Sequence, residues 1–359
     1  MHIALLESFY GGSHRAFADG LVAHSRHDWG LFTLPDRHWK WRMHDAAVSL
    51  ASQLLDHGSS PDLVVCTSLM DVAALRGFLQ QAGLHVPVVV YFHENQLAYP
   101  SSPKDRDQQA GYDNHYAYLN YSSALVADGV AFNSAYNRES FLEALPKFLQ
   151  QFPDSYRPQD IEAIHAKSCV LHVGLSLTRA IPKPPRIQPL VLWNHRWAHD
   201  KGPDLFFESL MALSEEGAAF DLAVAGPSSG RAPEVFARAK PRLTQHLIHW
   251  GPASQVDYLQ LLRDATLLPV TAQHEFFGIA VLEAVHHGVR PLLPKRLVYP
   301  EHFSVPGIFY NSDTDFKDQL RLQLLTPSPC PEEVQAVPSS YAWPEVVPRF
   351  DQYFDSFAP

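Results

Sequence analysis

Short apolar runs alternate with amphipathic helical stretches along most of this 359-residue chain, and no other feature of the sequence constrains its fold as much. Runs rich in valine and leucine, each followed by a helical stretch, predict parallel strands covered by helices on both faces. In the first half the predicted strands are Ile3–Glu7, Leu31–Leu34, Leu63–Thr67, Val88–Phe92, Val130–Asn133 and Val170–Val173. The predicted helices include Ala46–Leu55, Asp71–Gln81 and Tyr136–Gln150.

The pattern starts again after the proline-rich tract Arg179–Pro189, which we interpret as a linker because it cannot form a regular helix. Strands are predicted at Leu190–Asn194, Asp221–Ala225, Leu247–Trp250, Thr266–Val270 and Arg290–Leu293. Helices are predicted at Asp204–Leu213, Pro233–Leu243, Gln255–Arg263, Ile279–His287 and Asp315–Leu325. The chain is therefore expected to be an α/β protein with two Rossmann-like, doubly wound parallel-sheet domains that face a central cleft.

We expect the first domain to span residues 1–178 and the second 189–342, which suits a chain long enough for about two domains. The last stretch, 343–359, is aromatic and amphipathic. We predict that it forms a helix that packs back on the first domain.

Composition narrows the functional classes. The three cysteines lie far apart, which argues against a disulfide framework or a zinc knuckle. No basic leader segment and no apolar run near the roughly 20 residues of a membrane span are visible, so we expect a cytoplasmic protein without a membrane partner. The net charge of −10 disfavours indiscriminate binding to nucleic acid, although a local basic patch stays compatible with it.

Two carboxylates, Glu275 and Glu283, flank Gly278 in the segment HEFFGIAVLEA. This segment follows a predicted strand and opens a predicted helix, so Glu275 is expected on the loop and Glu283 one or two turns into the helix. The amides of Phe277, Gly278 and Ile279 would be free at the helix start, where an anion binds favourably. One acid can bind sugar hydroxyls and the other can reach a ribose, so the arrangement suits a nucleotide-sugar.

Two cations, Arg196 and Lys201, follow the first strand of the second domain. A departing nucleoside diphosphate accumulates negative charge as a glycosidic bond breaks, and cations stabilise that transition state more than the ground state. The alternative is a solvated loop with ordinary surface charges. The solvated-loop interpretation is disfavoured because both cations and both acids lie at the carboxyl side of one predicted sheet.

Polar residues also follow strands of the first domain. The pair Gly11 and Gly12 allows a sharp turn and a close approach to a ligand, but a plain strand-to-helix turn explains it equally well. His93 ends the fourth strand and is expected to project into the cleft, although a strand-end histidine is often only hydrogen-bonded. Asn133 ends the next strand and could equally belong to a helix cap.

A basic and aromatic segment runs from Arg37 through Trp39, Lys40 and Trp41 to Arg42. Rings that stack on unpaired bases and cations that meet phosphates suit RNA. Taken alone, a basic helix start with two buried tryptophans is the favoured interpretation.

Two DxD motifs, Asp105–Asp107 and Asp313–Asp315, compete with this scheme because such pairs can hold a divalent metal on a diphosphate. The first has no strand before it, and the second leaves only a short tail. We interpret Asp313 or Asp315 as a helix cap. No metal or other cofactor is therefore expected, and Arg196 with Lys201 would take the place of the metal.

The second half resembles the GT4 family of retaining glycosyltransferases, which have the GT-B fold. The resemblance lies in HRWAHDKGPDL, FDLAVAG, HWGPASQVDYLQLLRDATLLPV and HEFFGIAVLEA. It implies that Arg196 and Lys201 hold the diphosphate, that Glu275 holds the donor-sugar hydroxyls, and that Glu283 holds the ribose. The amides of residues 277–279 would touch sugar and phosphate, and Gly11 and Gly12 would approach the diphosphate.

The first half resembles the tRNA-queuosine mannosyltransferase family in FYGGSH, LPDRHWKWR, YFHENQLAYP, QAGYDN and VAFNSAYNRESFL. This resemblance implies GDP-mannose as donor and the cyclopentenediol of queuosine, in the tRNA-Asp anticodon, as acceptor. We assign His93 to the sugar. The residues assigned to the acceptor and its tRNA are Ser13, His14, Arg37, Trp39, Lys40, Trp41, Arg42, Glu94, Asn95 and Asn133.

Two alternatives stay open. One is a GT4 enzyme that acts on a glycan or lipid acceptor. The other is a non-catalytic protein that binds a sugar-nucleotide or RNA, which the presence of both cations and both acids disfavours. The acidic net charge is compatible with a tRNA substrate only if the basic patch is local.

Overall fold

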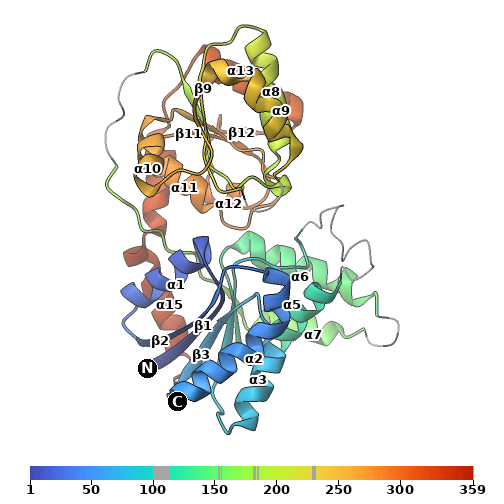
Figure 1. The fold of residues 1–359 in the computed structure, drawn as a ribbon. Coiled ribbons are helices and arrows are strands. Elements are labelled where there is room, and N and C mark those ends of the chain that lie inside the picture. The colour runs from blue at the N-terminus through green and yellow to red at the C-terminus, as the bar shows by residue number, and fades with distance from the viewer. Residues whose placement is uncertain are drawn as a thin grey trace. The chain divides into compact units, whose positions relative to one another are not determined.

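The computed structural model describes residues 1–99, 114–152, 154, 156–180, 183, 186–228 and 232–358. It divides the chain into two compact units (Figure 1). Unit 1 comprises Met1–Ser176 and Tyr341–Pro359, and unit 2 comprises Leu177–Ser340. Across the described part of the chain, no helix has the length and apolar character needed to cross a membrane.

The sheet of unit 1 contains six parallel strands in the order β2-β1-β3-β4-β5-β6. The chain runs outward from β1 to β2 on one side and from β3 to β6 on the other, so the order reverses between β1 and β3. The strands are β1 His2–Tyr10, β2 Asp28–Pro35, β3 Leu63–Thr67, β4 Val88–Phe92, β5 Gly129–Phe132 and β6 Ser168–Val170. Ligands of doubly wound sheets bind outside the carboxyl ends of the strands at such a reversal.

The helices described in unit 1 are α1 Gly12–His24, α2 Trp39–His57, α3 Val72–Gln81, α5 His115–Val126, α6 Ala135–Leu149, α7 Pro158–Ala166 and α15 Trp343–Asp355. The C-terminal helix α15 lies beside α1, far from it in sequence (Figure 1). The first residue of α15, Trp343, is fully buried. A Cβ atom added at Gly20 or Gly174 would lie within 2.5 Å of the indole ring, so both positions must lack a side chain.

The sheet of unit 2 also contains six parallel strands, in the order β12-β11-β10-β7-β8-β9, and its order reverses between β7 and β10. The strands are β7 Leu190–Trp193, β8 Asp221–Val224, β9 Leu247–Trp250, β10 Leu267–Pro269, β11 Arg290–Pro294 and β12 Phe309–Tyr310. The helices are η1 His199–Lys201, α8 Pro203–Glu215, α9 Glu234–Arg242, η2 Thr244–His246, α10 Gln255–Asp264, α11 Ile279–His286, α12 Tyr299–His302, α13 Asp313–Leu325, α14 Glu332–Ala336 and η3 Val337–Tyr341.

The apolar runs located the strands well because a strand that is buried on both faces must be continuously apolar. The predictions for Leu63–Thr67, Val88–Phe92 and Leu247–Trp250 are confirmed to the residue. The run Val170–Val173 was placed too far along the chain, because β6 ends at Val170. The proline-rich tract has no regular structure where it is described, and Lys183 within it donates to the Ala265 carbonyl of unit 2.

The predicted cap of α13 is confirmed in part, because Asp315 takes part in the capping but is not the N-cap. Ser312 is the N-cap, and its hydroxyl accepts from the Asp315 amide over 3.2 Å. The Asp315 carboxylate in turn accepts from the Asn311 amide over 2.7 Å. This reciprocal arrangement satisfies two amides at the helix start, and it is the reason that an acid stands at this position.

Trp343→Ala is expected to destabilise unit 1 by roughly 3–5 kcal/mol, because it removes a large ring from a site that cannot collapse around two glycines. Urea unfolding followed by circular dichroism measures the change. Trp41→Ala is the matched control, since Trp41 is 65% exposed and its loss should change stability by no more than about 0.5 kcal/mol. Equal effects of the two substitutions would contradict the anchoring role of Trp343.

Candidate active site

An ion cluster lies at the carboxyl edge of the second sheet, where β7 and β10 are neighbours. The Lys201 ammonium donates to Glu275 Oε2 over 2.9 Å and to the His274 carbonyl over 3.2 Å. The Asp200 carboxylate lies 3.5 Å from the same ammonium and accepts from the Arg196 guanidinium over 2.8 Å. Two cations and two carboxylates thus compensate one another in one place.

The loop that carries Lys201 is seated directly on the end of β10. Gly202 has a φ of 63°, and a Cβ atom there would lie 2.1 Å from the Thr271 carbonyl oxygen. The Thr271 hydroxyl lies 3.1 Å from the Lys201 carbonyl and 2.8 Å from the Gly202 carbonyl, so it can donate to either. These contacts bring the β7 loop against the β10 loop and thereby set the distance between Lys201 and Glu275.

Electrostatics keep the cluster ionised. Burial by itself would lower the pKa of Lys201, but the carboxylates of Glu275 and Asp200 raise it above its ordinary value. Burial would likewise raise the pKa of Glu275, but Lys201 holds it at about 2. The neighbouring His195 is neutral, since burial and the Lys201 charge lower its pKa to about 4. The site therefore presents an ionised carboxylate that can accept hydrogen bonds from hydroxyls.

The loop before α11 folds back on Glu275. The amides of Phe276 and Phe277 lie 3.1 Å and 3.3 Å from Glu275 Oε1 and donate to it. The Phe277 amide is therefore not free, contrary to the prediction, because the carboxylate satisfies its own downstream backbone. The amides of Gly278 and Ile279 have no partner among the residues that the structure describes, and they stand at the N-terminus of α11.

Hydrogen bonds through Tyr258 and Asn194 connect Glu283 to the same edge of the sheet. Glu283 accepts from the Tyr258 hydroxyl over 3.1 Å. Asn194, which follows β7, donates to that hydroxyl over 3.2 Å and to the Ala280 carbonyl over 2.8 Å. Burial raises the pKa of Glu283, and the bond from Tyr258 opposes that rise only in part.

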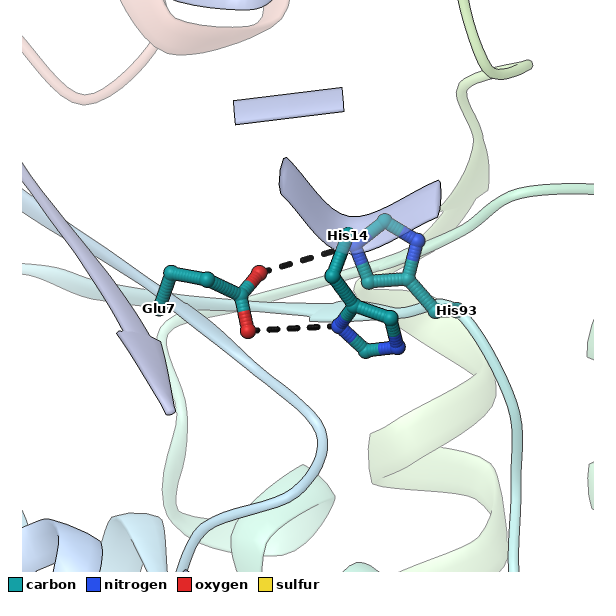
Figure 2. A group of neighbouring side chains, drawn as sticks. All are labelled: Glu7, His14 and His93. Carbon is teal, nitrogen blue, oxygen red and sulfur yellow. Dashed lines mark hydrogen bonds and ion pairs between the residues drawn. The ribbon is translucent and has the colours of Figure 1, made fainter. Parts of the chain in front are cut away.

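A second cluster lies at the carboxyl edge of the first sheet, beside the reversal between β1 and β3 (Figure 2). Glu7 of β1 is fully buried, and its Oε1 lies 3.2 Å from His14 Nδ1 and accepts from the Thr67 hydroxyl over 3.0 Å. Glu7 Oε2 lies 3.9 Å from Nε2 of His93, which follows β4. On its other side, His14 Nε2 lies 3.4 Å from Glu94 Oε2.

The two histidines of this cluster have opposite charge preferences. Burial by itself would lower the pKa of His14, but Glu7 and Glu94 raise it to about 10. Burial and the neighbouring His14 lower the pKa of His93 well below its ordinary value. Within the described residues, Glu7, His14 and His93 form the group whose ligand atoms are close enough together to share a metal ion.

The comparisons with known proteins concern both units. A family model described as tRNA-queuosine alpha-mannosyltransferase N-terminal matches residues 2–175, and one described as glycosyl transferases group 1 matches residues 178–303. A tRNA-queuosine alpha-mannosyltransferase from Drosophila melanogaster is 34% identical over 325 residues, which are 87% of this chain and 84% of that protein. The chain belongs to the tRNA-queuosine alpha-mannosyltransferase family. It is a glycosyltransferase.

Solved structures support the fold of this family member over its whole length. Sucrose-phosphate synthase from Thermosynechococcus elongatus superposes with a TM-score of 0.71 at 13% identity, and the match covers 99% of this chain and 98% of that one. A lipopolysaccharide outer core galactosyltransferase superposes with a TM-score of 0.64 at 16% identity, covering 99% of each chain. The predicted GT-B fold is confirmed.

In unit 2 of this mannosyltransferase-family chain, the predicted site residues lie at one edge of the sheet. Arg196, Lys201 and Glu275 form the ion cluster, and Glu283 joins it through Tyr258 and Asn194. Their proposed roles toward a donor stay predictions. Lys201 differs from the expectation in one respect, because its charge is already compensated by two carboxylates.

In unit 1 several predicted contacts are buried instead. Asn95 is fully enclosed: its amide donates to the Asn137 side chain over 2.7 Å, and its oxygen accepts from the Ala98 amide. Asn133 is also buried and donates to the His93 carbonyl over 2.7 Å. The polar groups at these strand ends are satisfied inside the unit, and the assignment of Asn95 and Asn133 to the acceptor and its tRNA stays a prediction.

The two histidines also point inward. The His93 ring packs 4.7 Å from Phe17 and 4.9 Å from Tyr91 between ring centroids, and His14 is 7% exposed. His93 therefore does not project outward as predicted. Gly11 has a local structural reason, since a Cβ atom there would lie 2.0 Å from the Asp36 carboxylate.

The basic and aromatic segment is divided between surface and interior. Arg37 and Trp41 are exposed, as is Ser13 at the start of α1. The Lys40 ammonium lies 5.7 Å from the ring centre of half-buried Trp39. Arg42 is not a free cation: its side chain is 11% exposed and donates to the Pro35 carbonyl. Of the two predicted DxD motifs, Asp105–Asp107 lies outside the described residues.

Sequence reasoning missed four residues that organise the two clusters: Glu7, Thr67, Asp200 and Tyr258. One signal was available, because Glu7 interrupts the apolar run of a strand predicted to be buried on both faces. An acid there must be paired inside the protein. Thr67 and Tyr258 gave no signal, since their partners are distant in the sequence. Asp200 lies between Arg196 and Lys201, so its charge was a local signal that was not used.

Acid titration should separate the two carboxylates of unit 2. Because the pKa of Glu275 is lowered to about 2, its ionised form stabilises the folded state above about pH 4.5, and this contribution is lost as the pH falls toward about 2. The difference in unfolding free energy between wild type and Glu275→Gln should therefore shrink with falling pH.

Glu283→Gln is the matched control. The pKa of Glu283 is raised, so the wild type should gain stability relative to this variant as the pH falls. Urea unfolding between about pH 5 and pH 3 measures both differences. Parallel slopes for the two variants would contradict the ion pair.

Proposed function

We propose that this chain transfers mannose, with retention, from GDP-mannose to the cyclopentenediol of queuosine in tRNA-Asp. The observation that carries the proposal is the ion cluster of unit 2 in a chain of this family. Lys201, Glu275, Arg196 and Asp200 meet at the sheet edge where doubly wound domains bind their ligands. The relative from Drosophila melanogaster is named a tRNA-queuosine alpha-mannosyltransferase, which supports queuosine in tRNA as the acceptor.

Unit 2 would hold the donor. The Arg196 side chain is 46% exposed, so its guanidinium can turn toward a diphosphate while Asp200 limits its range. Glu275 is held ionised by Lys201 and would accept hydrogen bonds from the sugar hydroxyls. The amides of Gly278 and Ile279 at the start of α11 would meet phosphate oxygens. Glu283 would bind the ribose.

In the reaction, the bond between the anomeric carbon and the phosphate oxygen breaks as the acceptor hydroxyl attacks from the same face. The departing diphosphate takes the proton of that hydroxyl, so no protein nucleophile is needed. Arg196 and Lys201 would stabilise the charge that develops on the diphosphate. We propose that this step needs no divalent metal.

Unit 1 would bind the tRNA. Trp41 stands exposed in the first turn of α2, and exposed Arg37 precedes that helix. An indole can stack on an unpaired base and a guanidinium can meet a phosphate. A local contact of this kind is compatible with the overall charge of −10.

The transfer reaction itself is the first test. The full-length chain is incubated with GDP-mannose and queuosine-containing tRNA-Asp, and the modified nucleoside should gain the mass of one hexose.

Lys201→Ala should lower turnover by a factor that corresponds to about 2–4 kcal/mol of transition-state stabilisation. Lys317→Ala, an exposed lysine on α13 of the same unit, is the control and should retain turnover. Transfer to a glycan or lipid but not to tRNA would contradict the proposed acceptor. Full activity of a folded Lys201→Ala variant would contradict the proposed role of Lys201.

The tRNA surface has its own test. Trp41→Ala should weaken tRNA binding by about 1–3 kcal/mol, the usual contribution of one stacked base, without loss of stability. Arg37→Ala should weaken binding and reduce its dependence on salt concentration. Phe78→Ala removes a partly exposed ring from α3 of the same unit and should leave binding unchanged. Filter binding at several salt concentrations measures the tRNA affinity of each variant. Equal affinity of Trp41→Ala and wild type would contradict the assignment of Trp41 to the tRNA.

A further inference from the structure

Glu7, His14 and His93 have the composition and placement of a metal-ligand set. They come from β1, from α1 and from the loop after β4, and they are 0%, 7% and 8% exposed. One ligand atom from each lies within 4.8 Å of the others. The donor contacts proposed for unit 2 do not involve them.

Two atoms of the cluster lack the partner that burial demands. Within the described part of the chain, Glu7 Oε2 and His93 Nε2 are fully buried and make no hydrogen bond. They face each other over 3.9 Å, which is too long for a hydrogen bond (Figure 2). A buried polar atom without a partner costs about 1–3 kcal/mol, so an unpaired pair of this kind needs an explanation.

A metal ion bound between Glu7 Oε2 and His93 Nε2 would explain why these two buried atoms have no hydrogen-bond partner. Zinc binds imidazole nitrogen and carboxylate oxygen at about 2.0–2.2 Å, so two ligands of a tetrahedral ion lie about 3.4 Å apart. Glu7 Oε2 and His93 Nε2, at 3.9 Å, would have to approach each other by about 0.5 Å to bind such an ion. His14 Nδ1, at 3.2 Å from the other Glu7 oxygen, would complete the set once the ion displaces the proton of the imidazolium, because a metal-binding histidine must be deprotonated.

The surroundings also match those of metal ligands. Metal-binding histidines usually present their second nitrogen to a carboxylate, and ligating carboxylates are themselves hydrogen-bonded. His14 Nε2 lies 3.4 Å from Glu94 Oε2. Glu7 Oε1 accepts from the Thr67 hydroxyl over 3.0 Å and from the Phe9 amide over 2.9 Å. These bonds leave Glu7 Oε2 as the ligand oxygen.

We propose that Glu7, His14 and His93 bind one divalent transition-metal ion, with zinc the preferred ion. Two imidazoles and one carboxylate suit borderline cations such as zinc and not magnesium or calcium, which prefer oxygen ligands alone. Three protein ligands leave one position of tetrahedral zinc for a water or a hydroxyl oxygen. The ion would join β1, α1 and the β4 loop at the carboxyl edge of unit 1.

The inference is independent of the proposed sugar transfer, because its test measures metal directly. The full-length chain, without an affinity tag, is loaded with zinc, passed through a chelating resin and analysed by plasma mass spectrometry. We expect about one zinc per chain for wild type and less than about a tenth for Glu7→Gln. Cobalt in place of zinc should give the intense visible absorption of a tetrahedral site.

Three further variants keep the test decisive. His93→Gln should also lose the metal, which guards against misfolding of Glu7→Gln as the cause. Glu94→Gln should keep the site but weaken its zinc affinity about 10–100-fold, as expected for the partner of a ligand. His165→Asn, an exposed histidine on α7, should bind as wild type does. If wild type retains no more zinc than Glu7→Gln, the cluster is an ion pair of Glu7, His14 and Glu94, and the proposal is wrong.

Discussion

The chemistry of both units depends on the point where the strand order of each sheet reverses. On either side of β1 and β3, and of β7 and β10, the connecting segments leave in opposite directions. The loops at the carboxyl ends of these strands therefore diverge and leave room for side chains and ligands. Glu7 and Thr67 meet at the first reversal, and Lys201 and Glu275 meet beside the second.

Burial of charge shapes both clusters in the same way. A buried ion is tolerated only when an opposite charge and hydrogen bonds compensate the loss of water. Lys201 meets this condition through Glu275, Asp200 and the His274 carbonyl. In unit 1 the compensation is incomplete, because Glu7 Oε2 and His93 Nε2 have no partner within the described residues. The Lys201 cluster suits a preorganised donor site, and the Glu7 cluster suits a site that takes up an ion.

Local sequence patterns predicted much of the fold. Continuous apolar runs such as Val88–Phe92 gave the buried strands, and the carboxylates Glu275 and Glu283 were correctly placed on the loop and the helix around Gly278. Contacts between side chains that are distant in the sequence were not predicted. Asn95 and Asn133 were assigned to the acceptor and its tRNA, and the structure shows that they also bond to α6 and to the β4 loop inside the unit. Arg42 was assigned to the tRNA, and the structure shows that its guanidinium also donates to the Pro35 carbonyl.

The sequence by itself determined that the chain has two parallel α/β units and which residues stand at the carboxyl ends of the strands, because period and apolar content are local properties. Only the tertiary structure decided which of those ends are neighbours. Strand order arises from hydrogen bonds and packing between segments far apart in the chain, as between Glu7 and Thr67 or between Lys201 and Glu275. A single sequence carries no local signal for such pairings. The sequence therefore placed the cations and acids of unit 2 at one sheet edge, but only the folded protein showed the Lys201–Glu275 contact and the Glu7 cluster.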